Sequence, residues 1–186
     1  MTDADFQIRP AVPGDGAAIA DLFVTVNRDL APPDRREAFE DYIVLSLREE
    51  IEPFMSYYAR DRGNGLWVVV AEGEVAGMYG LERVSGTDVE LRRMYVAPGW
   101  RRKGLARRML RHAEGMARDL GYRLMVLSTS EIQEAALALY RAEGFRYVRE
   151  ETAEAKSNKT IGGGIVRYHF EKRLAGAASG AGDSAG

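Results

Sequence analysis

Hydrophobic residues recur at helical spacing in the first third of the chain and at strand spacing after it. Residues 19–26 and 39–51 each repeat an apolar side chain every three or four positions, which is typical of an amphipathic helix. The proline pair Pro32 and Pro33 separates the two stripes. The pattern therefore predicts two helices, preceded by a short strand at residues 6–9.

Beyond residue 65 the pattern changes to strands and turns. Three β-rich runs separated by turns predict an antiparallel meander at residues 66–71, 75–83 and 89–97. The rest alternates between helix and strand, with helices at residues 104–120 and 130–144 and strands at residues 123–128, 145–150 and 165–174. A meander that leads into a β-α-β crossover implies an α+β fold with a mixed, largely antiparallel sheet of about seven strands and helices on both faces.

Length and composition limit the classes of protein. The chain has 186 residues, which is enough for a single domain, expected over residues 1–174. The tail, residues 175–186, is rich in Gly, Ala and Ser and is expected to be disordered. No apolar run has membrane-spanning length, and we interpret the chain as cytoplasmic. Zero cysteines exclude an acyl-cysteine intermediate, and two isolated histidines predict no metal site.

Charge is distributed unevenly along the chain. The formal net charge is −2, which does not favour nucleic acid or an anionic membrane as a partner. Residues 101–120, however, hold seven Lys or Arg against two acidic residues, a local net charge of +5 in a chain that carries −7 elsewhere. A small basic patch on an acidic protein fits a compact polyanion. The alternative, a solvated helix face, applies better to Arg108, Arg111 and Arg118 than to the cations of the turn at residues 101–103.

The basic turn lies between the third meander strand and the following helix. A helix start leaves backbone N–H groups unpaired and carries partial positive charge, so it attracts phosphate. Gly104 and Ala106 keep the surface bare, so that a pyrophosphate can approach the backbone closely. Strand alternation predicts that Glu90, Arg92, Met94 and Val96 share one face of the strand before the turn. A phosphate cradle with a carboxylate nearby suggests a cofactor site with its own base.

Two motifs resemble the Gcn5-related N-acetyltransferase (GNAT) family. Arg101-Arg-Lys-Gly104-Leu-Ala106 matches the family's acetyl-CoA signature, which is Gln or Arg, two residues, Gly, one residue, then Gly or Ala. The second motif is Gln133-Glu-Ala-Ala-Leu-Ala-Leu-Tyr140-Arg-Ala-Glu-Gly144-Phe145, where the family has Asn, Ala, Leu-Tyr and Gly-Phe in this order. The resemblance covers residues 6–174 and implies a three-layer α/β/α domain with the GNAT fold.

The resemblance also implies a cofactor site. The backbone of residues 102–107 would bind the pyrophosphate of coenzyme A, and the main chain at residues 94–96 would bind its pantetheine arm between splayed strands. The cofactor-binding residues implied are Met94, Tyr95, Val96, Arg101, Arg102, Lys103, Gly104, Leu105, Ala106, Arg107 and Gln133. Gln133 replaces the family asparagine, so it either contacts the cofactor or caps its helix together with Ser130.

Two residues are catalytic candidates. Tyr140 matches the family tyrosine that protonates the departing thiolate, although a helix tyrosine can also only pack on the core. Glu90 lies eleven positions before Arg101, a spacing that resembles the catalytic glutamate of the histone-acetylating branch. It is either the base that deprotonates the attacking amine or the partner of Arg92 or Arg83 in a structural ion pair.

The function implied is an acetyl-CoA-dependent N-acetyltransferase, an acyltransferase that acts by direct transfer in a ternary complex. The alternative is a non-catalytic acyl-CoA-binding regulatory module, which needs neither Glu90 nor Tyr140. The acceptor amine stays open among a protein lysine, a protein N-terminus, a polyamine, an amino acid and an antibiotic.

Residues 152–164 resemble the acceptor-side loop of the family, which makes them either a lid or a mobile hairpin connection. Homodimers are common in the family.

Overall fold

The computed structural model describes residues 6–174, so the predicted disorder of residues 175–186 lies outside the described residues. The strands are β1 (Phe6–Pro10), β2 (Gly65–Ala71), β3 (Glu74–Arg83), β4 (Asp88–Val96), β5 (Leu124–Ser130), β6 (Arg146–Ala153) and β7 (Ile165–Arg173). The helices are α1 (Gly16–Leu30), α2 (Arg36–Ser46), α3 (Phe54–Tyr57), α4 (Leu105–Asp119) and α5 (Glu134–Ala142). None of the helices in this part of the chain is long and apolar enough to cross a membrane.

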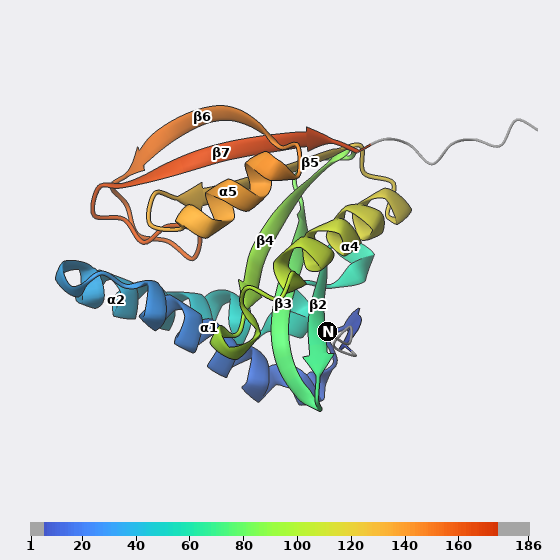
Figure 1. The fold of residues 1–186 in the computed structure, drawn as a ribbon, viewed down its shortest axis with the longest axis horizontal. Helices are drawn as coiled ribbons and strands as arrows, with labels where there is room; N and C mark the ends of the chain where they lie inside the picture. The colour runs from blue at the N-terminus through green and yellow to red at the C-terminus, as the bar shows by residue number, and fades with distance from the viewer. Residues whose placement is uncertain (1–5, 175–186) are drawn as a thin grey trace, which may run out of the picture.

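The seven strands form one mixed sheet in the order β1-β2-β3-β4-β5-β7-β6 (Figure 1). Only the β4–β5 pair is parallel, which confirms the predicted fold class. Each face of the sheet has its own hydrophobic core. One core packs α4 and α5 against the sheet, and the other packs α1, α2 and α3 against the opposite face. The three layers follow from the helical stripes, because each helix has to bury one apolar side.

The two parallel strands separate soon after they meet. Their pairing covers only Asp88, Glu90 and the residue between them, although β4 continues to Val96 and β5 to Ser130. In Figure 1 the two strands diverge beyond this point. Among residues 6–174, no strand pairs with this side of β4 over its last residues, as the predicted splay requires.

A bulge in β4 changes which side chains share a face. The register between β3 and β4 shifts beside Arg93, whose φ is 52°. A bulge inserts one extra residue, so the alternation after it is offset by one. Glu90 and Arg92 lie on the side of α1 and α2, whereas Met94 and Val96 pack into the core under α4. The prediction that these four residues share one face is therefore wrong.

Helix α5 also begins later than predicted. Ser130 is the last residue of β5 and pairs with Arg167 of β7, because the antiparallel ladder between these strands continues that far. The helix starts at Glu134 with Gln133 as its N-cap residue. Gly144 follows the helix with a φ of 82°, in agreement with its predicted role as the stop.

Candidate active site

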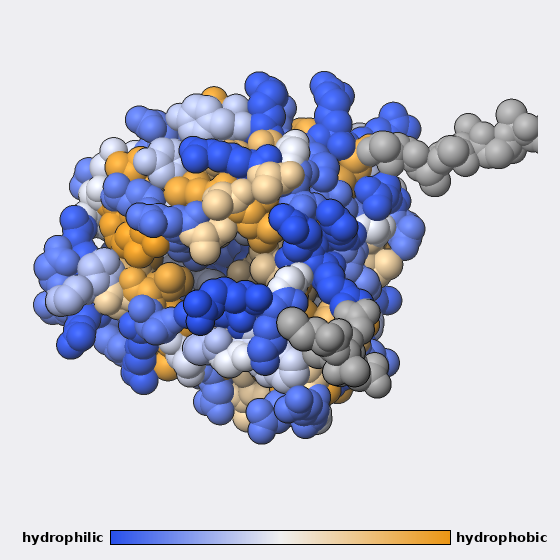
Figure 2. All heavy atoms as spheres, in the orientation of Figure 1, coloured by the Kyte–Doolittle hydropathy of each residue, from blue (hydrophilic) through white to orange (hydrophobic). Residues whose placement is uncertain are grey.

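A groove of about 680 Å³ lies where β4 leaves β5. Its walls are the end of β4, the turn at residues 100–104, the first turn of α4, and α5. Figure 2 shows the molecule hollowed here, with hydrophobic surface along α5 and hydrophilic surface on the opposite rim. Ten of the eleven cofactor-binding residues implied by the sequence line this groove, and Lys103 does not. The Lys103 ammonium lies 4.5 Å from the centre of the Trp100 ring instead.

The turn at one end of the groove has the backbone of an anion cradle. Arg102 and Gly104 both have left-handed backbone angles, with φ of 60° and 79°. This conformation turns successive N–H groups to one side, next to the N-terminus of α4. A Cβ atom placed on Gly104 would meet nothing within 4 Å, so the space above the turn is open. The turn and the groove thus fit a pyrophosphate followed by a long, narrow arm.

The exposed edge of β4 supplies polar main-chain groups to the groove. The N–H of Ala97 donates to the carbonyl of Ala76 on β3, at 2.9 Å. Main-chain groups of consecutive strand residues point to opposite sides, so those of Val96 point away from β3, toward the groove. The Arg101 side chain also reaches the Val96 carbonyl, at 3.4 Å.

Gln133 lies between the groove and the strand ends. Its side-chain carbonyl accepts hydrogen bonds from the Thr129 hydroxyl, at 2.8 Å, and from the Ser130 N–H, at 3.3 Å. Ser130 ends β5 and Gln133 is itself the N-cap residue of α5, so this contact does not cap the helix as predicted. The amide N–H₂ of Gln133 has no acceptor among residues 6–174, so the same side chain keeps donors for a ligand.

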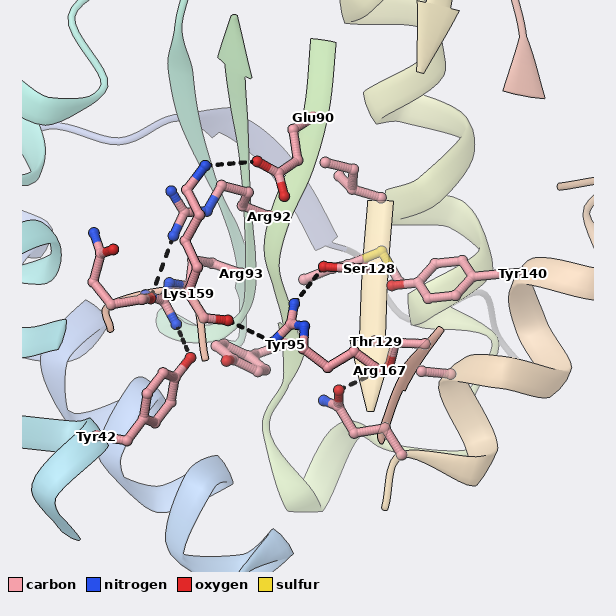
Figure 3. Close-up of a pocket in the computed structure, with 15 residues that line it drawn as sticks. Tyr42, Glu90, Arg92, Arg93, Tyr95, Ser128, Thr129, Tyr140, Lys159 and Arg167 are labelled. Carbon is pink, nitrogen blue, oxygen red and sulfur yellow. Dashed lines mark hydrogen bonds and ion pairs between the residues drawn. The ribbon is translucent and has the colours of Figure 1, made fainter. Parts of the chain in front are cut away.

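A second, smaller cavity of about 100 Å³ opens beside the groove (Figure 3). Four residues line both spaces, which therefore meet at Met94, Tyr95, Gln133 and Ala136. The smaller cavity is polar, and both catalytic candidates, Glu90 and Tyr140, line it. A molecule in the groove and a second one in the cavity would touch at this junction.

Tyr140 reaches the cavity from α5 (Figure 3). Its ring packs against Phe145 and Phe170, at 5.7 and 6.3 Å between ring centres. Burial raises the pKa of the Tyr140 phenol above its usual value, so the hydroxyl keeps its proton at neutral pH. A neutral phenol at the junction is able to donate a proton.

Glu90 is ion-paired, but with neither of the partners considered from the sequence. Its carboxylate lies 2.9 Å from the Lys159 ammonium (Figure 3). The same ammonium is 3.1 Å from the Glu82 carboxylate. Burial lowers the pKa of Lys159, but the hydrogen bond and charge of Glu90 outweigh it, so the net pKa is raised. Lys159 thus holds a positive charge where Glu90 faces the cavity.

A buried ionic cluster underlies the cavity. The Glu50 side chain is 0% exposed, and its Oε2 atom lies 2.6 Å from Arg93 and 2.8 Å from Arg92. The Tyr58 hydroxyl donates to the same carboxylate. Burial raises the pKa of Glu50, but the two guanidinium groups, Arg93 first, outweigh it and lower the pKa. The Glu50 carboxylate and the two guanidinium groups therefore remain ionised.

The sequence indicated little of this cluster. Two consecutive arginines inside an apolar strand are a signal of a bulge, because they break the alternation. Glu50 has no such signal. It becomes buried because residues Leu47–Ile51 form a π-helical turn, which widens the helix and turns both Glu50 and Ile51 inward.

The loop between β6 and β7 lies over the cluster. The main-chain carbonyl of Asn158 accepts hydrogen bonds from Arg93 and Arg92. Lys156 pairs with Asp41 of α2, and Arg35 donates to the carbonyl of Gly163. These contacts anchor the loop at three points, so in this structure it covers one side of the cavity.

The chain is similar in sequence to proteins named N-acetyltransferase and N-acetylaspartate synthetase. The chain is 30% identical to human N-acetyltransferase 8 over 116 residues, which is 60% of this chain and 51% of that protein. It is 34% identical to N-acetylaspartate synthetase of Danio rerio over 116 residues, which is 62% of this chain and 41% of that protein. The chain thus matches about half the length of these relatives.

Solved structures share the fold. An N-acetyltransferase from Staphylococcus aureus superposes with a TM-score of 0.69 at 18% identity, over 92% of this chain and 99% of that chain. An acetyltransferase from Salmonella typhimurium, whose structure contains acetyl-CoA, superposes with a TM-score of 0.66 at 22% identity, over 94% and 97% of the two chains. The sequence model of the acetyltransferase (GNAT) family matches residues 20–145, and this range contains both motifs. The chain therefore belongs to the GNAT acetyltransferase family, as the two motifs predicted.

Proposed function

We propose that this protein transfers the acetyl group of acetyl-CoA to a primary amine by direct transfer in a ternary complex. The observation that carries the proposal is the junction of the groove and the smaller cavity at Met94, Tyr95, Gln133 and Ala136. Two substrates bound on either side of this junction have their reacting atoms in contact. Direct transfer requires this, because the amine must be held next to the acetyl group that it attacks.

The groove is the proposed acetyl-CoA site. The turn at residues 101–104 and the start of α4 bind the pyrophosphate, and the edge of β4 binds the pantetheine arm. The thioester then lies at the junction, with main-chain N–H groups of β4 near its carbonyl oxygen. Such donors stabilise the oxyanion that develops during acyl transfer.

The smaller cavity is the proposed acceptor site. Glu90 takes a proton from the incoming ammonium, directly or through water, after which the amine nitrogen forms a bond to the acetyl carbon. The C–S bond breaks, and Tyr140 gives its proton to the departing thiolate. The nitrogen loses its second proton as the amide forms, and that proton returns the Tyr140 phenol to its neutral form. Relatives named N-acetylaspartate synthetase have, by that name, an amino acid amine as acceptor, which supports a small primary amine as the substrate class.

A non-catalytic acyl-CoA-binding module is the alternative. The position of Glu90 and Tyr140 on one cavity beside the groove favours the enzyme, because a binding module needs neither group. The test is an amine panel incubated with acetyl-CoA, with release of coenzyme A and the mass of each product measured. Binding of acetyl-CoA without release of coenzyme A for any amine would support the binding module.

A glutamate at Ala106 is expected to weaken binding of coenzyme A. Ala106 lines the groove in the first turn of α4, where a carboxylate opposes the pyrophosphate and offsets the helix dipole. We expect the dissociation constant for coenzyme A to rise about tenfold or more, which corresponds to a loss of about 1.4 kcal/mol in binding free energy. Tryptophan fluorescence measures this constant, because Trp100 lines the groove whereas the second tryptophan, Trp67, is buried in the core. Arg118→Gln, with the same change in charge on the exposed last turn of α4, is the control and should bind normally.

Direct transfer predicts that no acetyl-enzyme forms. The chain has no cysteine, the residue that most readily forms such an intermediate. Incubation with acetyl-CoA alone should leave the intact mass of the protein unchanged. Initial rates measured against both substrates should give intersecting double-reciprocal lines, and parallel lines with a mass increase of one acetyl group would contradict direct transfer.

A further inference from the structure

Arg167 is a cation of the acceptor cavity that lacks a carboxylate partner. It belongs to β7, and its guanidinium extends toward the gap between β4 and β5 (Figure 3). It donates one hydrogen bond to the Ser128 hydroxyl and one to the main-chain carbonyl of Lys159. A guanidinium has five N–H donors, so three have no acceptor among the residues that the structure describes.

The other cations of this cavity are neutralised. Arg92 and Arg93 pair with Glu50, Arg92 also with Glu82, and Lys159 with Glu82 and Glu90. Four cations thus face three carboxylates, and the one left over is Arg167. No carboxylate in residues 6–174 lies within ion-pair distance of it.

The charged surroundings of Arg167 compensate for burial less than those of its neighbours do. Burial lowers the pKa of its guanidinium, and the surrounding groups do not restore it. For Arg92 and Arg93, burial has the same sign of effect, but nearby negative groups that include Glu50 raise the pKa above its usual value. A partly buried guanidinium without a counter-ion is unfavourable, and an anion bound beside it would remove that penalty.

We propose that Arg167 binds a carboxylate of the acceptor, so that the acceptor is a small amine with a carboxylate close to its amino group. This rests on the proposed acetyltransferase function. Glu90 and Arg167 line the same cavity of about 100 Å³, so the ammonium and carboxylate of one ligand have to lie close together. That separation is found in an α- or β-amino acid. The guanidinium fork suits a carboxylate because it forms two parallel hydrogen bonds.

The test compares each amino acid with its carboxamide, in which the carboxylate is replaced by a neutral group of nearly the same shape. The panel is the L-α-amino acids, β-alanine, the carboxamide of each, a polyamine and a lysine-containing peptide. Release of coenzyme A and product mass give kcat/KM for each. For the best amino acid, we expect the wild-type kcat/KM to exceed that of the matching carboxamide by about tenfold or more, which corresponds to about 1.4 kcal/mol.

Three variants separate recognition from folding. Arg167→Met should abolish the preference, mainly through KM for the amino acid, while keeping turnover of the carboxamide. Arg167→Lys should restore part of the preference for the carboxylate, because lysine keeps the charge but not the guanidinium fork. Arg173→Met is the matched control, since Arg173 is an exposed residue of the same strand, and it should behave as wild type. Binding of coenzyme A, followed by Trp100 fluorescence, shows that each variant is folded.

The outcomes distinguish this inference from the proposed function. Wild-type preference for carboxamides, polyamine or peptide would overturn the carboxylate role of Arg167 and leave the acetyltransferase function in place, as would a preference that survives Arg167→Met. Absence of coenzyme A release with every amine would overturn the acetyltransferase function. In that case the thermal stabilisation by N-acetyl amino acids in the presence of coenzyme A tests carboxylate binding by itself: stabilisation of wild type but not of Arg167→Met would support it, and equal stabilisation of the two would contradict it.

Discussion

Phenylalanine in place of Tyr140 is expected to lower kcat by about 10²-fold or more, the usual effect of removing a general acid. The reason is that the thiolate leaves the junction where the Tyr140 hydroxyl lies, and phenylalanine has no proton to give. Because the side chain is only 6% exposed, bulk water is a poor substitute for the lost acid. The KM for acetyl-CoA should change little, since the groove residues are untouched.

The substitution should leave the fold intact. Phenylalanine keeps the ring contacts with Phe145 and Phe170. The Tyr140 hydroxyl makes no hydrogen bond to any residue in the range 6–174, so none is lost. Tyr147→Phe is the matched control, because it removes an exposed phenol hydroxyl from β6 near the same ring of Phe170. Steady-state kinetics with the best acceptor measure the effect, and an unchanged kcat in Tyr140→Phe would mean that Tyr140 only packs.

Glutamine in place of Glu50 is expected to lower the free energy of unfolding by about 3–5 kcal/mol, as when one partner of a buried ion pair is removed. Glu50 is the common partner of Arg92 and Arg93, and all three side chains are buried. Without the carboxylate, two guanidinium groups stay in the interior with less compensation. The loop at residues 154–164 should loosen as well, because both arginines hold the Asn158 carbonyl.

Urea unfolding followed by circular dichroism measures this difference. Glu49→Gln is the matched control, since Glu49 is the exposed neighbour and pairs only with Arg48 on the surface. The control should change stability by no more than about 0.5 kcal/mol. Equal stability of the two variants would contradict the structural role of Glu50.

The effect of Glu50→Gln should also depend on pH. The pKa of Glu50 is lower in the folded protein, so its contribution is complete above the unfolded value of about 4.3. As the pH falls through the folded pKa, the carboxylate takes up a proton and the contribution disappears. The stability difference between wild type and Glu50→Gln should therefore be full at neutral pH and shrink in acid.

Local patterns were sufficient for the order of the elements and for the position of the proposed cofactor turn. Helical stripes and strand runs depend on which side chains can be buried at 3.6- or 2-residue spacing, and the sequence displays both directly. The turn at residues 101–106 is also local, since its glycine, its cations and the following helix start are contiguous in the chain. These features were predictable because each depends on residues close together in sequence.

The proposed acceptor cavity depends on residues that are far apart in sequence. It brings together Tyr42, Glu90, Tyr140, Lys159 and Arg167, which lie on five different segments. The β4 bulge, which places Arg92 and Arg93 on the same side, is decided by pairing with β3 and by the buried Glu50 carboxylate. The sequence by itself thus determined the family and the fold class, and it contains the turn that we propose as the phosphate site. Only the tertiary structure decided which charges are neutralised in the cavity and that Arg167 has no carboxylate partner among residues 6–174. Ion pairing and burial depend on distances between segments that no local pattern encodes.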